Sequence, residues 1–102
     1  MMKSFGDMMK QAQKVQKQMG ELQSQLADER HEASAGGGIV KAVVDGKQML
    51  KEIKISPEAL KESDVTLLED LVLTAVGEAQ RTSQEKMAEA YSKVTGGFNL
   101  PF

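Results

Sequence analysis

The chain has 102 residues, a formal net charge of −2 and no cysteine. This length suits one small domain, and the lack of cysteine excludes disulfides, thiol catalysis and thiolate metal sites. The sequence has no run approaching the roughly 18 consecutive apolar residues of a membrane-spanning helix, and its first residues lack the apolar run of a signal peptide. We therefore expect a cytoplasmic protein.

A long amphipathic helix is predicted from about residue 5 to about residue 30. Its apolar residues follow the alternating spacing of a heptad seam. The seam comprises Phe5, Met8, Ala12, Val15, Met19, Leu22 and Leu26. A helix of about 25 residues is about 38 Å long, more than a small globule can cover, so we expect part of it to project and contact a second copy. The alternative is an ordinary amphipathic helix packed on its own domain.

Positive charge lies on the other side of the same helix. Residues 1–20 contain four lysines and one acid, whereas residues 21–32 contain four acids and one arginine. Lys3, Lys10 and Lys17 share the heptad position farthest from the seam, and Lys14 lies beside them. Because a solubilising face usually mixes both signs, this face is a candidate for DNA phosphate contacts that tolerate any base sequence. A face that only keeps the helix soluble is the alternative.

Three antiparallel strands are predicted over residues 31–55. We interpret the triple glycine of residues 36–38 as a strand-to-strand turn with positive φ, since no Gly-Lys-Ser/Thr follows as in a phosphate-binding loop. Asp45-Gly46 indicates a hairpin. The expected core face of the hairpin comprises Val40, Ala42, Val44, Met49, Ile53 and Ile55.

Two helices are predicted after the sheet. Ser56-Pro57 begins a short helix over about residues 57–61, and Ser63 or Asp64 caps a long helix over about residues 64–95. The tail, residues 96–102, is too short for an element of its own. The apolar face of the long helix should pack on the sheet; it comprises Val65, Leu68, Leu71, Val72, Ala75, Val76 and Ala79.

The predicted fold class is α+β, in the order α-β-β-β-α with a short helix before the last long one and a three-stranded antiparallel sheet. The first helix ends at the sheet and the last begins there, so their free ends should lie on the same side of it. Arg81, Lys86 and Lys93 would then join the lysine face as secondary candidates for DNA contacts.

The sequence offers no catalytic constellation. His31 is the single histidine and lies among acidic residues, where we expect it to be solvated rather than to bind a metal or act as a base. No Gly-x-Ser-x-Gly motif occurs, and no second histidine could activate a serine. We therefore expect no enzyme activity, no cofactor, no metal and no small-molecule substrate.

Several short motifs resemble one known family in their order and spacing over nearly the whole length. These segments are Met8-Met9-Lys10-Gln11-Ala12-Gln13, Gly36-Gly37-Gly38-Ile39-Val40-Lys41, Asp45-Gly46, Ile53-Lys54-Ile55-Ser56-Pro57-Glu58, Leu68-Glu69-Asp70-Leu71, Ala75-Val76-Gly77-Glu78-Ala79 and Thr95-Gly96-Gly97. The chain resembles the YbaB/EbfC family of bacterial nucleoid-associated DNA-binding proteins.

The resemblance implies a single domain over residues 1–102 and a homodimer shaped like tweezers, whose projecting helices bind double-stranded DNA. It also implies a location in the nucleoid, a role in organising it and sometimes an effect on gene expression. It brings no enzymatic activity and no cofactor. From the lack of an apolar span we also expect no membrane partner. The alternative from the sequence is a protein-interaction module, in which the helix tips and the tail from Phe98 to Phe102 hold a protein partner.

Overall fold

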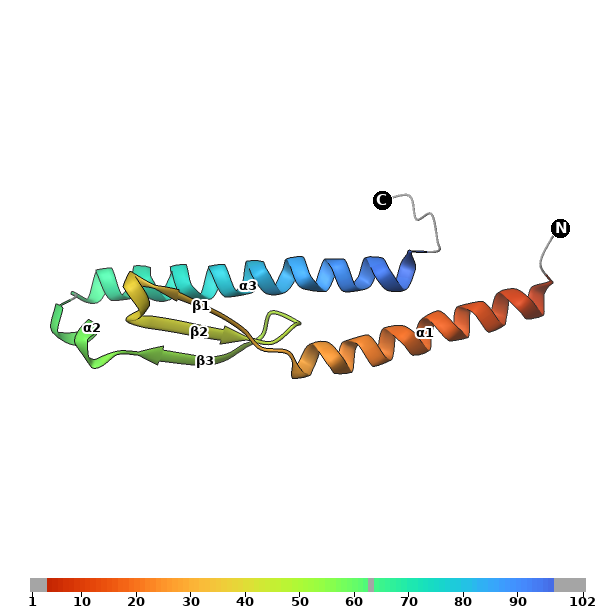
Figure 1. Ribbon diagram of the computed structural model, residues 1–102, viewed down its shortest axis with the longest axis horizontal. Coiled ribbons are helices and arrows are strands. Elements are labelled where there is room, and N and C mark those ends of the chain that lie inside the picture. The colour runs from red at the N-terminus through yellow and green to blue at the C-terminus, as the bar shows by residue number, and fades with distance from the viewer. Residues whose placement is uncertain (1–3, 63, 97–102) are drawn as a thin grey trace.

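The computed structural model describes residues 4–62 and 64–96 and has the predicted α+β architecture (Figure 1). Lys3 and the tail from residue 97 onward lie outside the described residues. The molecule is elongated, with extents of 70 × 24 × 16 Å. In chain order its elements are α1 (Phe5–Asp28), β1 (His31–Ala35), the 3₁₀ turn η1 (Gly36–Gly38), β2 (Val40–Val44), β3 (Leu50–Ile55), α2 (Pro57–Glu62) and α3 (Val65–Thr95).

Short polar side chains begin the two long helices. Ser4 Oγ accepts a hydrogen bond from the N–H of Asp7 at 3.2 Å, which satisfies one of the free donors in the first turn of α1. Asp64 Oδ1 accepts from the N–H of Leu67 at 2.7 Å, so Asp64 is the cap of α3. α1 therefore begins at the predicted residue, and α3 begins with Asp64, one of its two predicted caps; the other, Ser63, lies outside the described residues.

The sheet has the strand order β1-β2-β3 with both pairings antiparallel, so β2 is central. α3 runs along one face of the sheet and packs on β1 and β2 (Figure 1). The core consists mainly of small side chains, which lets α3 approach the sheet closely. It is formed by Ala35, Val40, Ala42, Val44, Ala75 and Ala79.

Three details of the predicted core differ. Val65 is exposed, and the face of α3 that packs on the core begins at Leu68. Met49 is exposed as well, because β3 begins only at Leu50 and the strand pairing contains an irregularity beside Val44. Ile55 is also exposed, because α3 packs on β1 and β2 and leaves β3 partly uncovered. Ile53 is half-buried and packs against the core on the predicted face.

The triple glycine forms the predicted turn with positive φ at all three residues, from 64° at Gly36 to 97° at Gly38. Gly36 is also needed for space. A Cβ atom there would lie 2.9 Å from Ile39 Cγ1 and 3.1 Å from Leu71 Cδ2. A side chain at this position would therefore be strained by its positive φ and would crowd Ile39 and, from α3, Leu71.

The hairpin between β2 and β3 closes on a buried carboxylate. Asp45 Oδ1 accepts hydrogen bonds from the N–H groups of Lys47 at 2.8 Å and Met49 at 3.0 Å. These bonds hold residues 47–49 in a turn, and Gln48 adopts a φ of 69° there. This local bonding is the reason why Met49 does not continue the strand.

The same turn contacts both long helices. The N–H of Gly46 donates to the carbonyl of Leu26 in α1 at 2.7 Å. The buried hydroxyl of Ser83 in α3 donates to the carbonyl of Asp45, also at 2.7 Å. The turn therefore joins the sheet, the end of α1 and the middle of α3.

The Asp45 carboxylate should make the stability of the fold sensitive to acid. Burial by itself raises the pKa of Asp45, but hydrogen bonds from Met49 and Lys47 and the positive charges of Lys51 and Arg30 together lower this pKa below 3.8. Because the folded pKa is depressed, the stabilisation is present above the unfolded pKa of about 3.9 and is lost as pH falls through the folded value. Urea unfolding at a series of pH values should show a steeper acid loss for the wild type than for Asp45→Asn. Identical pH dependence of the two proteins would contradict this role.

Candidate nucleic-acid interface

α1 and the last part of α3 leave the sheet in the same direction as two arms, and α1 continues beyond the end of α3 (Figure 1). The arms lie next to each other at their base and enclose an open groove of about 570 Å³. The polar residues lining this groove include Gln18, Glu21 and Gln25 of α1 and Lys86, Glu89 and Lys93 of α3.

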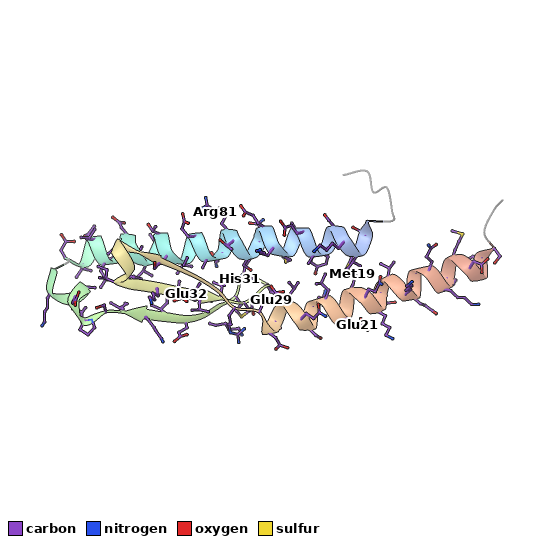
Figure 2. The ribbon with its side chains drawn as sticks, viewed as in Figure 1. Met19, Glu21, Glu29, His31, Glu32 and Arg81 are labelled. Carbon is purple, nitrogen blue, oxygen red and sulfur yellow. The ribbon has the colours of Figure 1, made fainter. Side chains whose placement is uncertain are left out.

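Exposure falls along the predicted seam from the tip of α1 to its base. The exposed fractions are 77% for Phe5 and 59% for Met8, but 8% for Leu22 and 1% for Leu26. Ala12 is exposed, and Val15 and Met19 are half-buried. Figure 2 shows Met19 on the side of α1 that faces α3.

The base of the seam is therefore filled by contacts within the same chain. Leu22 lines the groove together with Ala90 and Val94 of α3, and Leu26 lies against Gly46 of the hairpin turn. The apolar tip has no such cover among the described residues. Only this tip half of the seam is open to a second copy.

Lys10, Lys14 and Lys17 are all exposed on the projecting arm. Gln18 is the groove-lining residue of α1 that is farthest from the sheet, so Lys10 and Lys14 lie past the groove on the part of α1 that projects (Figure 1). Successive helix residues are rotated by about 100°, which places the three lysines about 80–140° around α1 from Leu22, on one flank of the arm. Within residues 4–62 and 64–96, none of the three forms an ion pair.

The secondary basic candidates divide into two groups. Lys86 and Lys93 face the groove, where Glu21 and Glu89 lie beside them, so the charge there is mixed. Arg81 lies on the outer side of α3, away from the sheet, and pairs with Glu78 at 3.1 Å (Figure 2). The structure thus brings two of the three to the arms and leaves Arg81 apart from them.

His31 differs from its expected solvated state. Its side chain is only 15% exposed, and Nε2 lies 2.9 Å from Glu29 Oε1 at the junction of α1 and the sheet (Figure 2). Among the described residues, no three His, Asp or Glu side chains are grouped so as to hold a metal ion. The described helices also include none that is long and apolar enough to cross a membrane.

An apolar groove at the opposite end of the molecule was missed by the sequence reasoning. It has a volume of about 430 Å³ and lies between β3 and the first turns of α3. α3 packs on β1 and β2, which leaves the apolar side of β3 partly uncovered. Its apolar lining consists of Ile55, Val65, Leu68, Val72 and Leu73. The sequence did contain a signal for this groove, because the predicted apolar face of α3 is wider than one small sheet can cover.

Residues 2–98 match the YbaB/EbfC DNA-binding family. The chain belongs to this family. Among its relatives, a nucleoid-associated protein of Desulforamulus reducens is 49% identical over 98 residues, covering 96% of this chain and 93% of the relative. A nucleoid-associated protein of Clostridium kluyveri is 45% identical over 98 residues, covering 96% of this chain and 86% of the relative.

The YbaB/EbfC fold is also found in a solved structure. The crystal structure of an uncharacterized protein from Helicobacter pylori superposes with a TM-score of 0.85 at 18% sequence identity. The match covers 93% of this chain and 100% of that one. The fold is therefore shared well beyond the range of close sequence similarity.

Truncation of the two ends of the seam should have different effects on stability. Leu26→Ala empties a buried site at the base of α1 and should lower the free energy of unfolding by about 2–5 kcal/mol. Met8→Ala removes an exposed side chain and should change it by about 0.5 kcal/mol or less. Denaturant titration of both variants measures the difference. An equally large destabilisation at Met8 would mean that the tip of the seam is covered in solution.

Proposed function

We propose that this chain is a nucleoid-associated protein that binds double-stranded DNA as a homodimer, through the tips of its arms and with little dependence on base sequence. The observation that carries the proposal is the exposed, unpaired set of Lys10, Lys14 and Lys17 on the projecting part of α1, among the residues that the structure describes. Membership of a DNA-binding family and the names of the relatives support it.

The charge distribution favours contact at the tip. Lys10 and Lys17 are separated by about 10 Å along the helix, so the three lysines can follow successive phosphates of a duplex. Lysine is a point charge on a flexible stem and suits phosphate contacts without base readout. Four acids at the base of α1 and the start of β1 oppose the approach of a polyanion there; they are Glu21, Asp28, Glu29 and Glu32. A chain with net negative charge can therefore still present a positive surface.

The remaining basic residues receive weaker roles in the proposal. Lys93 near the end of α3 would add a contact and Lys86, seven residues closer to the sheet, a weaker one, although Glu21 and Glu89 reduce the attraction of both for phosphate. Lys3 shares the heptad face of the tip lysines in the sequence and lies outside the described residues. Arg81 is the weakest candidate, because it is already paired with Glu78.

A second copy would double the number of phosphate contacts and hold two pairs of arms on one duplex. We assign the dimer interface to the apolar groove beside β3, since large exposed apolar side chains such as Val65 and Leu73 gather there. A copy bound at this end leaves the arm tips free, as the tweezer-like arrangement requires. The tip of the seam, from Phe5 to Ala12, is the alternative interface.

We further propose a location in the nucleoid within the cytoplasm, where many such dimers would organise DNA and thereby affect gene expression. Contacts that depend on phosphates rather than bases would spread over long stretches of DNA. The names of the relatives support this location.

The DNA site is tested by a salt titration of duplex binding. Replacing Lys10, Lys14 and Lys17 by glutamine should reduce the slope of log affinity against log salt by about 0.9 for each phosphate that these lysines neutralise. The matched control replaces Lys47, Lys54 and Lys61, which are also exposed and lie on the body of the protein rather than on α1. The control should keep the wild-type slope. Equal slopes for the two triple variants would exclude the tip as the site, and no binding by the wild type at low salt would favour the protein-interaction module.

The dimer interface is tested by sedimentation. Leu73→Lys places a charge in the groove beside β3 and should convert the dimer to a monomer, whereas Met8→Lys at the tip should leave the dimer intact. The reverse result would place the interface at the tip of the seam. A wild-type protein that sediments as a monomer at micromolar concentration would contradict the homodimer itself.

A further inference from the structure

The end of α1 is fixed to the hairpin turn by a backbone hydrogen bond. The last carbonyl groups of a helix lack partners within the helix. In α1 the carbonyl of Leu26 accepts from the N–H of Glu29 at 3.2 Å and, across the fold, from the N–H of Gly46 at 2.7 Å. The turn is therefore the point where the base of this arm meets the body of the protein.

Gly46 makes this close approach possible. Its φ lies outside the positive region that favours glycine, so its backbone conformation alone would accept alanine. The space around Gly46, however, is too small for an alanine side chain. A Cβ atom at Gly46 would lie 2.7 Å from the carbonyl oxygen of Leu26 and 2.9 Å from Glu29 Oε1. A side chain here must displace the backbone of α1 or the turn itself.

The other side of the turn is held by α3. Ser83 Oγ donates to the carbonyl of Asp45 at 2.7 Å, and Gln80 Nε2 donates to the carbonyl of Gln48 at 3.2 Å. Ser83 is fully buried. The turn thus lies between the two arms at their base, bonded to α3 on one side and to α1 on the other.

On the tip side of Leu22 no seam residue of the described chain is fully buried, so packing there does little to fix the separation of the arms. The groove between residues 18–29 and residues 86–94 is open, with a volume of about 570 Å³. Lys10 lies sixteen residues from Leu26, which is about 24 Å along the helix. A tilt of about 5° at the base therefore moves the tip by about 2 Å.

We propose that Asp45 and Gly46 are positioning residues that set the angle of the α1 arm relative to α3. They thereby set the distance between the tip lysines and the end of α3. In a dimer the same angle determines the opening between the two pairs of arms. The consequence for DNA rests on the proposed function, whereas the arm angle itself does not.

The arm angle can be measured directly because the chain has no cysteine. Spin labels attached through Gln16→Cys on α1 and Ser92→Cys on α3 report the distance between the arms by double electron–electron resonance. Labelled protein is diluted with unlabelled protein so that only distances within one chain are seen. Gln16 lies ten residues, about 15 Å, from Leu26, so a tilt of about 5° in Gly46→Ala should shift or broaden this distance by about 1 Å or more.

The matched control is Gly20→Ala, which lies within α1 where an added Cβ meets nothing within 4 Å. It should leave the distance unchanged. An unchanged distance in folded Gly46→Ala protein would overturn the proposal. If Gly46→Ala does not fold, Ser83→Ala removes the bond to α3 without adding atoms and should broaden the distance; a distance unchanged in that variant would overturn the proposal equally.

The link to DNA is tested with the same variants without labels. Gly46→Ala should bind duplex DNA several-fold more weakly than Gly20→Ala at one salt concentration. A changed arm distance with unchanged affinity would overturn the link between arm angle and DNA. A wild-type protein without DNA affinity would instead contradict the proposed function, while the distance measurement would still decide the role of the turn.

Discussion

The buried turn at Asp45 is the constraint on which the rest of this structure depends. The Asp45 carboxylate closes the hairpin, and the Asp45 carbonyl accepts a hydrogen bond from Ser83 of α3. The N–H of the next residue, Gly46, donates to the carbonyl of Leu26 at the end of α1. A small domain with a core made mostly of alanine and valine has little apolar area to fix the direction of a long helix. The hydrogen bonds of the buried turn fix the direction of α1 instead, and this direction makes α1 project from the body.

The arm separates two charge environments that the total charge conceals. Its tip is basic, and its base and the start of the sheet are acidic. Because salt screens charges over about 10 Å at 0.1 M, a polyanion at the tip is affected mainly by the tip lysines. Because α1 projects, the uneven distribution of charge along its sequence becomes a positive surface that lies away from the acidic body. This is a simple physical basis for DNA binding by an acidic member of the YbaB/EbfC family.

Much of the fold could be predicted from local sequence signals, since caps, glycines and periodicity act over a few residues. Asp64, the triple glycine and the alternation around Val40 and Ala42 behaved as local chemistry predicts. Features set by tertiary contacts could not be predicted in this way. Met49 lies outside β3 because its N–H donates a hydrogen bond to the Asp45 carboxylate. Leu26 is buried by contacts within its own chain. The heptad pattern identifies an apolar stripe, but it does not say which surface covers it.

DNA binding by the projecting part of α1 is tested most directly by an NMR titration of isotope-labelled protein with a short DNA duplex. Amide resonances of residues 8–18 on the projecting part of α1 should shift most, with smaller shifts near Lys86 and Lys93. Resonances of β3 and of α3 from Val65 to Leu73 should stay in place. Large shifts at this sheet end, with none on α1, would contradict the account.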